Sequence, residues 1–146
     1  MKRIVVIHGP NLNMLGKREP GVYGSETLSA LNDQLHKIAD HHHIALTCRQ
    51  SNYEGQIIEW LHQADEEADG VILNPGAFTH YSYAIRDAAA SIRTKIIEVH
   101  LSNIYRRESF RHTSVIAPVV SGQISGFGFA SYRLALEAFI GEDVIE

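Results

Sequence analysis

The sequence predicts an α/β fold in which helices cover both faces of a five-stranded parallel sheet. Short apolar runs that stop at Gly, Pro or Asn alternate along the chain with longer segments whose apolar residues have helical spacing. Runs that are apolar at nearly every position are typical of strands buried on both faces. Because strands and helices alternate, we expect a flavodoxin-like three-layer sandwich.

The composition is that of an ordinary globular domain. The chain has 146 residues, of which 45% are hydrophobic and 21% charged, so we expect a single domain over residues 1–146. Its apolar runs are shorter than the ~20 residues of a membrane span, which predicts a cytoplasmic protein without a membrane partner. The net charge of −4 argues against nucleic-acid binding.

A long loop is expected after the first strand. Residues 3–8 (RIVVIH) indicate a buried strand, and breakers follow it at Gly9, Pro10, Gly16, Pro20, Gly21 and Gly24. Loops of this length are commonly lids or binding loops, so residues 16–24 are predicted to form a mobile lid over a pocket. Leucines spaced from Leu28 to Leu35 predict the first helix, with Ser25 as its N-cap.

The rest of the chain continues the alternation. Further strands are expected at residues 44–49, 70–74 and 95–100, with a weaker fifth strand at 117–122. Helices are expected over residues 53–68, 82–91 and 127–140.

Polar residues gather where the predicted strands end, which is where ligands bind in open parallel sheets. The segments expected to converge there are residues 8–11, 74–77 with His80, 98–103 and 122–128. A neutral or anionic polyol would find donors and acceptors for its hydroxyls and a carboxylate in Asn11, Asn74, His80, Ser102 and Arg111. Taken singly, Asn74 could simply end a strand and His100 could be a satisfied core histidine.

The sequence does not fit a metal site or a dinucleotide-binding site. No Cys/His spacing matches a zinc site, and the adjacent histidines at 41–43 would point in different directions, as in a solvated turn. Gly126-Phe-Gly128 precedes the last helix, whereas a dinucleotide fingerprint belongs before the first. We therefore expect no metal and no cofactor. The basic cluster Tyr105-Arg106-Arg107 with Arg111 is too small for a duplex but sufficient for one small anion.

The strand-end segments also resemble a known family. The matching motifs are HGPNLNMLG at residues 8–16, REP at 18–20 with Tyr23-Gly24, NPGAFTH at 74–80 with Ser82, and EVHLSN at 98–103. They resemble, in order and over nearly the whole chain, those of type II 3-dehydroquinate dehydratase. Met14, where leucine is common in the family, is a mild departure.

The resemblance implies a flavodoxin-like subunit in a homododecamer, a tetramer of trimers. It implies a lyase that dehydrates 3-dehydroquinate to 3-dehydroshikimate without metal or cofactor, by anti elimination through an enolate. The reaction would belong to the shikimate pathway, which makes aromatic amino acids, or to the quinate pathway.

The resemblance also assigns roles by motif position. Tyr23 resembles the general base that removes the C2 proton, with Arg18 as the cation beside it. Asn11 resembles the group that stabilises the enolate. His100 is similar to the acid that protonates the departing C1 hydroxyl, with Glu98 orienting it. Substrate contacts are implied for Asn74, His80 and Arg111 at the ring hydroxyls, for the Leu101 and Ser102 amides at the carboxylate, for Gly76 and Ala77 beside them, and for Asp87 toward a neighbouring subunit's site.

Elementary chemistry agrees with these roles. Tyrosine, with a reference pKa of ~10, is a base only where a cation stabilises tyrosinate, and Arg18 and Arg107 are both candidates. Glu98 and His100 alternate onto the same face of a strand, so the carboxylate could keep the imidazole protonated and aimed. Lys17 alone among the lysines is expected near the site, and it has no apolar surroundings, which disfavours a Schiff base.

Two other interpretations compete. A flavodoxin-like signalling module would need acidic residues after the first and third strands, where this chain has His8 and Asn74, and a flavin binder would need a hydroxyl-rich phosphate loop. A different lyase, or a hydrolase with Ser102 as nucleophile, would need His100 or His80 as its base. No Gly-x-Ser-x-Gly elbow surrounds Ser102.

Overall fold

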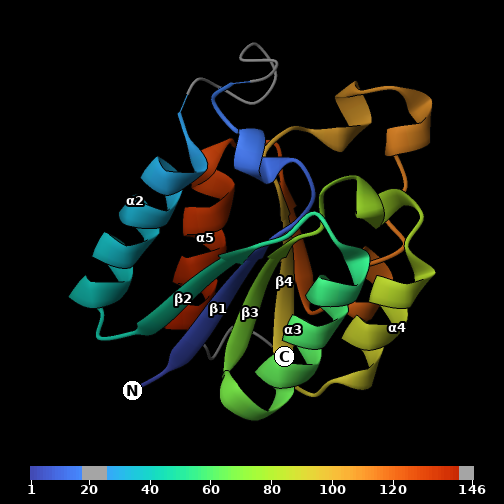
Figure 1. The fold of residues 1–146 in the computed structure, drawn as a ribbon. Coiled ribbons are helices and arrows are strands. Elements are labelled where there is room, and N and C mark those ends of the chain that lie inside the picture. Colours follow the sequence, from blue (N-terminus) through green and yellow to red (C-terminus); the bar gives the residue numbers. More distant parts are fainter. Residues whose placement is uncertain (18–25, 142–146) are drawn as a thin grey trace.

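The computed structural model describes residues 1–17 and 26–141 and contains a parallel five-stranded sheet in the order β2-β1-β3-β4-β5 (Figure 1). This is the flavodoxin-like strand order, in which the chain reverses its direction of progress at β1 and β3. The predicted α/β sandwich is therefore confirmed. The strands are β1 (Arg3–His8), β2 (Ala45–Gln50), β3 (Gly70–Asn74), β4 (Lys95–His100) and β5 (Gly122–Ser125).

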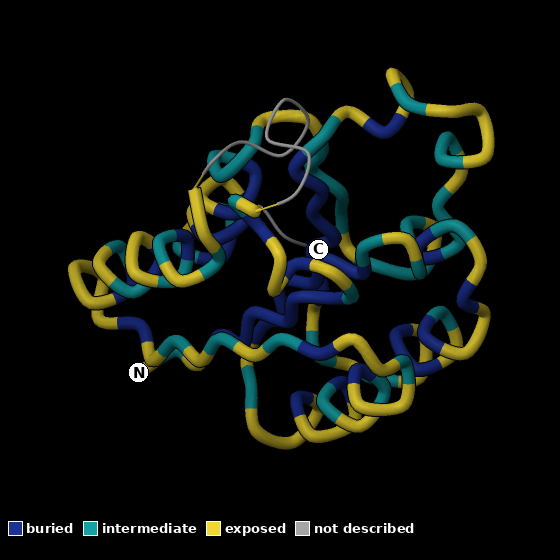
Figure 2. The backbone as a smooth tube through the Cα atoms, turned by 45° about the horizontal axis from the view of Figure 1, so that its top comes forward, coloured by how far each residue is buried: buried dark blue, intermediate teal, exposed yellow. Residues whose placement is uncertain are grey.

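Helices cover both faces of this sheet. On one side lie α2 (Leu28–His41) and α5 (Phe129–Ile140), and on the other α3 (Glu54–Glu67) and α4 (Tyr83–Ser91) (Figure 1). Each face has its own apolar cluster, because alternate strand residues point to opposite sides. The residues of β1, β3 and β4 are almost all buried, whereas those of β2 are partly exposed and the outer helix turns are exposed (Figure 2). In the described ranges, no helix is long and apolar enough to cross a membrane.

The first helix begins later than the sequence suggested. Its N-cap is Thr27, whose hydroxyl accepts a hydrogen bond from the backbone N–H of Ala30. The prediction of Ser25 as the cap was wrong, because Thr27 stands at the spacing from Ala30 that a capping hydroxyl requires. The start predicted for the third helix is confirmed, since Ser82 caps α4 through the Ile85 N–H.

The fifth strand was misplaced. Residues Ala117–Val119 form a short 3-10 turn, and β5 begins only at Gly122. Pro118 explains the difference, because proline lacks the N–H that a strand would donate and favours the first turn of a helix. The apolar run around it packs against the cluster on the α3 and α4 face, whereas β5 is a half-buried edge strand.

The connections after β1, β3 and β4 all lie at the carboxyl edge of the sheet (Figure 1). They contain the short turns η1 (Leu12–Met14), η2 (Gly76–His80), η3 (Ile104–Arg106) and η4 (Ser109–Arg111). Leu12 and Leu15 are buried in the cluster on the α2 and α5 face, so they anchor the segment that follows β1. The fold thus gathers three loops over the point where the strand order reverses.

Candidate active site

Glycine allows the ends of β1 and β3 to approach closely. The Gly9 N–H donates to the carbonyl of Asn74 at 2.7 Å, and a Cβ on Gly9 would lie 2.7 Å from the carbonyl carbon of Pro75. Asn11 follows in the left-handed conformation with φ 69°, which asparagine tolerates better than most residues. The loop therefore turns sharply beside the end of β3.

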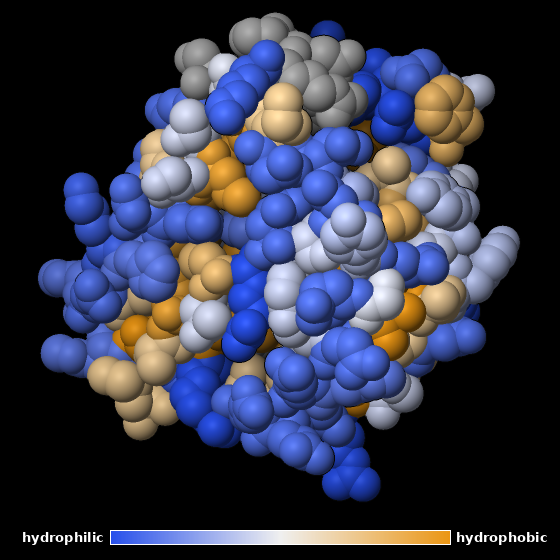
Figure 3. Space-filling model, viewed as in Figure 1, coloured by the Kyte–Doolittle hydropathy of each residue, from blue (hydrophilic) through white to orange (hydrophobic). Residues whose placement is uncertain are grey.

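A pocket opens between these loops, and its lining contains most of the predicted site. Nine residues assigned from the sequence contribute to it: Asn11, Asn74, Gly76, Ala77, His80, His100, Leu101, Ser102 and Arg111. The sequence had not assigned the other lining residues: Pro10, Leu12, Met14, Leu15, Ile104 and Arg107, of which Arg107 had been considered only as a cation. The face of the molecule seen in Figure 3 is largely hydrophilic with small apolar patches.

Of the predicted site residues that the structure describes, Glu98 and Asp87 do not line this pocket. Arg18 and Tyr23 lie outside the described residues, as does most of the predicted lid at 16–24. Asp87 is exposed on α4 and lines no part of the pocket. Lys17 is also exposed and does not line the pocket.

His100 and Glu98 form a buried pair at the end of β4. The ring Nε2 of His100 lies 2.5 Å from Glu98 Oε2, and their side chains are 8% and 0% exposed. Burial raises the pKa of Glu98, but hydrogen bonds from His100, Thr79 and Ser114 outweigh it, so that the pKa lies below its usual value. Glu98 is therefore an ionised acceptor, and Nε2 of His100 carries a proton directed at it.

Thr79 and Ser114 support this pair, and the sequence had not assigned either a role. The Thr79 hydroxyl donates to Glu98 Oε2 at 2.5 Å, and the Ser114 hydroxyl lies 3.1 Å from both carboxylate oxygens. Thr79 is fully buried in η2. Its place in the NPGAFTH segment was the available signal, but the contact joins the turn η2 to the strand β4, 19 positions further along the chain.

The other imidazole and the arginines have defined partners. Nδ1 of His80 donates to the carbonyl of Thr113 at 2.8 Å, which leaves Nε2 as its other hydrogen-bonding atom. Burial lowers the pKa of His80, against the opposing effect of that hydrogen bond. Arg111 pairs with Glu108 at 3.0 Å, and Arg107 Nη1 lies 3.4 Å from the Ser102 hydroxyl. In the described part of the chain the Ser102 hydroxyl contacts Arg107 and hydrogen-bonds to neither imidazole, so the pattern does not favour Ser102 as a nucleophile.

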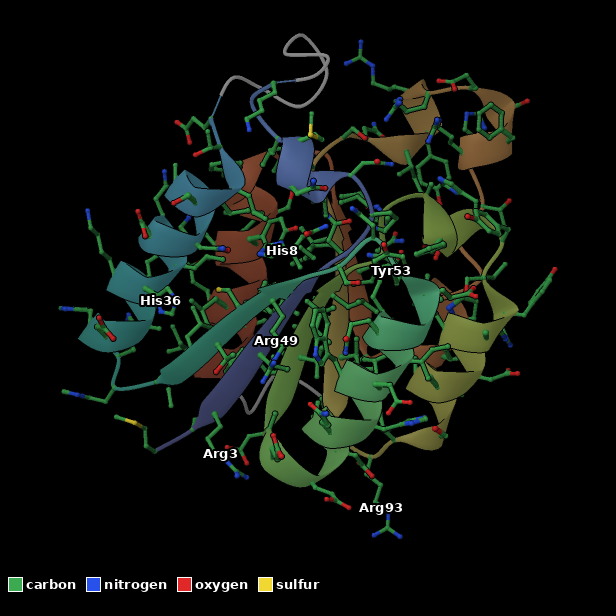
Figure 4. All side chains as sticks on the ribbon, in the orientation of Figure 1. Arg3, His8, His36, Arg49, Tyr53 and Arg93 are labelled. Carbon is green, nitrogen blue, oxygen red and sulfur yellow. The ribbon has the colours of Figure 1, made fainter. Side chains whose placement is uncertain are left out.

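His8, at the end of β1, points to the face of the sheet that α2 and α5 cover. Its ring is fully buried beside α2 and α5 (Figure 4) and bonds to Asn32 and Tyr132. Burial lowers its pKa to about 4, against the hydrogen bond to Asn32. This imidazole is neutral and does not line the pocket.

The histidines at 41–43 are exposed, as expected of a solvated turn. Within residues 1–17 and 26–141, no group of three or more His, Cys, Asp or Glu side chains is arranged to hold a metal ion. The chemistry that the pocket offers is hydrogen bonding to hydroxyls, an amide-rich strand end suited to an anion, and a buried imidazole–carboxylate pair for proton transfer.

Comparisons with known proteins agree on one family. The family model for dehydroquinase class II matches residues 2–140. A 3-dehydroquinate dehydratase of Halalkalibacterium halodurans is 62% identical over 140 residues, covering 96% of this chain and 97% of that protein. One from Pelotomaculum thermopropionicum is 60% identical over 136 residues, covering 93% and 94%.

Solved structures give the same result. The crystal structure of a type II dehydroquinase from Butyrivibrio crossotus superposes with a TM-score of 0.93 at 47% identity, covering 96% of this chain and 97% of that one. A type II dehydroquinase from Propionibacterium acnes superposes with a TM-score of 0.94 at 40% identity, covering 97% of each chain.

Proposed function

This chain belongs to the class II dehydroquinase family and dehydrates 3-dehydroquinate in the shikimate pathway, and from this premise we propose how its residues perform the reaction. The proposed path is an anti elimination through an enolate to 3-dehydroshikimate. The observation that carries it is that His100, in the wall of a pocket rich in hydroxyl-binding groups, pairs with the fully buried Glu98.

His100 is the proposed general acid. Expulsion of unprotonated hydroxide from C1 would be slow, so a proton must be delivered as the C–O bond breaks. Because Nε2 is engaged by Glu98, the proton must come from Nδ1, and the acid is therefore the doubly protonated ring. After transfer the ring is neutral and still donates from Nε2 to Glu98.

Tyr23 is the proposed base, in its ionised form. It would remove a C2 proton, and the resulting enolate would collapse with loss of the C1 hydroxyl as water, forming the C1–C2 double bond. Each unit by which its pKa falls below ~10 requires about 1.4 kcal/mol of differential interaction. Arg18 from the same loop is the proposed cation, and Arg107, in the pocket wall, is the second candidate.

The remaining polar groups are proposed to bind and polarise the substrate. Asn11, at the loop turn, would stabilise the enolate oxygen, in part through water. The ring hydroxyls would contact Asn74, His80 and Arg111, and Gly76 and Ala77 would shape the wall next to them. The carboxylate would lie on the amides of Leu101 and Ser102, because backbone N–H groups at a strand end suit an anion.

The reaction removes water without a net change of oxidation state, and Tyr23 and His100 would supply its base and its acid, so we propose that it uses neither metal nor cofactor. Residues 16–24 are proposed to be the lid that brings Tyr23 to the substrate. We also propose one cytoplasmic catalytic domain over residues 1–146, assembled as a homododecamer, a tetramer of trimers, in which Asp87 serves a neighbouring subunit's site.

The test is a cofactor-free assay with 3-dehydroquinate, in which the conjugated product is followed in the ultraviolet. EDTA-treated, folded protein should remain fully active, and loss of activity would contradict the mechanism. Tyr23→Phe should abolish turnover while substrate still binds, whereas near-normal kcat would exclude Tyr23 as the base. His100→Ala should fail at dehydration but still exchange the C2 proton with solvent. Borohydride with substrate should leave every lysine unmodified.

A further inference from the structure

A chain of hydrogen-bonded side chains runs from the pocket wall across the α2 and α5 face of the sheet to helix α2. Nδ2 of Asn74 lies 2.9 Å from the Tyr132 hydroxyl, which lies 3.0 Å from Nδ1 of His8. Nε2 of His8 in turn lies 2.8 Å from Oδ1 of Asn32. Asn74, Tyr132 and His8 are 3%, 0% and 0% exposed, so water does not compete for these bonds. The line joins β3, α5, β1 and α2.

The direction of every bond in this line follows from one backbone amide. The Gly76 N–H can only donate, and it donates to Asn74 at 3.0 Å, so the atom facing it must be the amide oxygen. The NH₂ group of Asn74 therefore faces Tyr132 and donates to its hydroxyl. A buried hydroxyl needs its own acceptor, and Nδ1 of His8 is the one beside it.

If Nδ1 of His8 accepts, the neutral ring carries its proton on Nε2 and donates to the Asn32 oxygen. The low pKa of His8, near 4 because of burial, agrees with a neutral ring. Burial also raises the pKa of Tyr132, which keeps its hydroxyl proton in place. Reversing the line would leave the Tyr132 proton buried without an acceptor, which costs about 1–3 kcal/mol.

We propose that Tyr132 and His8 are positioning residues that hold Asn74 in one orientation, as a hydrogen-bond donor to the substrate. This rests on the proposed contact of Asn74 with a ring hydroxyl. Asn74 is held at both ends of its amide, by Gly76 and by Tyr132. The NH₂ group has a second hydrogen, and it is this donor that the pocket-lining side chain offers to a substrate oxygen.

Tyr132→Phe tests the proposal, because it keeps the packed ring and removes only the hydroxyl. The KM for 3-dehydroquinate should rise about tenfold while kcat stays within about twofold, since a bond to a non-reacting hydroxyl contributes equally in ground and transition states. The matched control is Thr94→Val at the opposite end of the sheet, where a hydroxyl that donates to Ala64 is lost. It should lower stability and leave KM unchanged.

A double-mutant cycle separates positioning from general damage. Asn74→Ala should raise KM, and adding Tyr132→Phe should raise it no further, because the hydroxyl acts through Asn74. Independent, multiplying effects, or an unchanged KM in folded Tyr132→Phe, would overturn the inference alone. An unchanged KM in Asn74→Ala would overturn both the inference and the proposed role of Asn74.

Asn32→Ala provides a second route if Tyr132→Phe does not fold. Asn32 is only partly buried on α2, so its removal should be tolerated. Without its oxygen, Nε2 of His8 loses its acceptor and the ring its fixed tautomer. KM should rise about threefold, in the same direction as in Tyr132→Phe. An unchanged KM would contradict the extension of the line to His8.

Discussion

Glu98 shows how a single carboxylate can be buried and remain ionised. Removal from water alone would favour its protonated form. Three groups offset that cost, since His100, Thr79 and Ser114 all direct hydrogen atoms at its oxygens. The pKa of Glu98 is consequently lowered and not raised. The orientation of His100, the proposed acid, therefore depends on residues that do not contact the substrate.

Thr79→Val should reveal this dependence. The substitution keeps the side-chain shape and removes the donor to Glu98, so the pKa of Glu98 should rise and the orientation of His100 should loosen. We expect kcat to fall about tenfold with KM little changed, because hydrogen bonds to charged groups contribute about 1.5–3 kcal/mol. The pH profile of kcat should shift as well, which a purely structural role would not produce. Thr94→Val, away from the pocket, is the control, and equal kcat in the two variants would contradict the role of Thr79.

At the scale of elements, the loop after β1 depends on a glycine at its first position. A Cβ at Gly9 would lie 2.7–2.8 Å from backbone atoms of Asn74 and Pro75, which cannot move without disturbing β3. Gly9→Ala should therefore cost about 1–3 kcal/mol of unfolding free energy and displace Asn11, with loss of activity.

Gly55→Ala is the matched control for that variant. Gly55 lies in the first turn of α3, and a Cβ there would meet nothing within 4 Å beyond the backbone of its own helix. Alanine there should be neutral or stabilise by up to about 1 kcal/mol, as measured by urea unfolding. If the two glycine variants had equal stability, the close approach of β1 and β3 would not be the constraint.

The elements that the sequence predicted well are those whose pattern has one interpretation. β1, β3 and β4 are apolar along nearly their whole length and buried, so local sequence identified them. β5 is half-buried and follows a more apolar run that packs as a turn, so hydrophobicity selected the wrong segment. The same limit applies to the site. The strand-end rule located its lining, but Glu98 meets Thr79 across 19 positions and Asn74 meets Tyr132 across 58.

At the scale of the molecule, stability should depend on pH through His8. Burial in the folded protein lowers the pKa of this imidazole from 6.5 to about 4. Between these two pH values the unfolded chain binds a proton at His8 and the folded protein does not. The free energy of unfolding therefore keeps its full value, as far as His8 is concerned, above pH 6.5. It falls by roughly 3 kcal/mol as the pH falls toward 4. The stabilisation from ionised Glu98, whose usual pKa is 4.5 and is lowered in the folded protein, is lost only at a lower pH.

Urea unfolding between pH 7 and pH 4.5, at constant protein concentration, measures this dependence. His8→Gln cannot titrate, so its unfolding free energy should be lower at pH 7 but fall less steeply with acidification. His41→Gln, at an exposed position, is the control and should keep the slope of the unaltered protein. If the unfolding free energies of His8→Gln and the unaltered protein changed equally with pH, the pKa of His8 would not be lowered in the folded protein.

The proposed sharing of sites between subunits can be tested by mixing two inactive proteins. His100→Ala removes the acid from a subunit's own pocket, and Asp87→Ala removes a group that lies on α4 outside that pocket. If Asp87 serves the neighbour, an Asp87→Ala subunit becomes active when a His100→Ala subunit stands beside it. Random assembly at equal amounts should restore roughly a quarter of the sites. Refolding the two variants together and assaying 3-dehydroquinate dehydration measures this recovery, with each variant refolded alone as the control. No recovery in mixed assemblies would confine Asp87 to its own subunit.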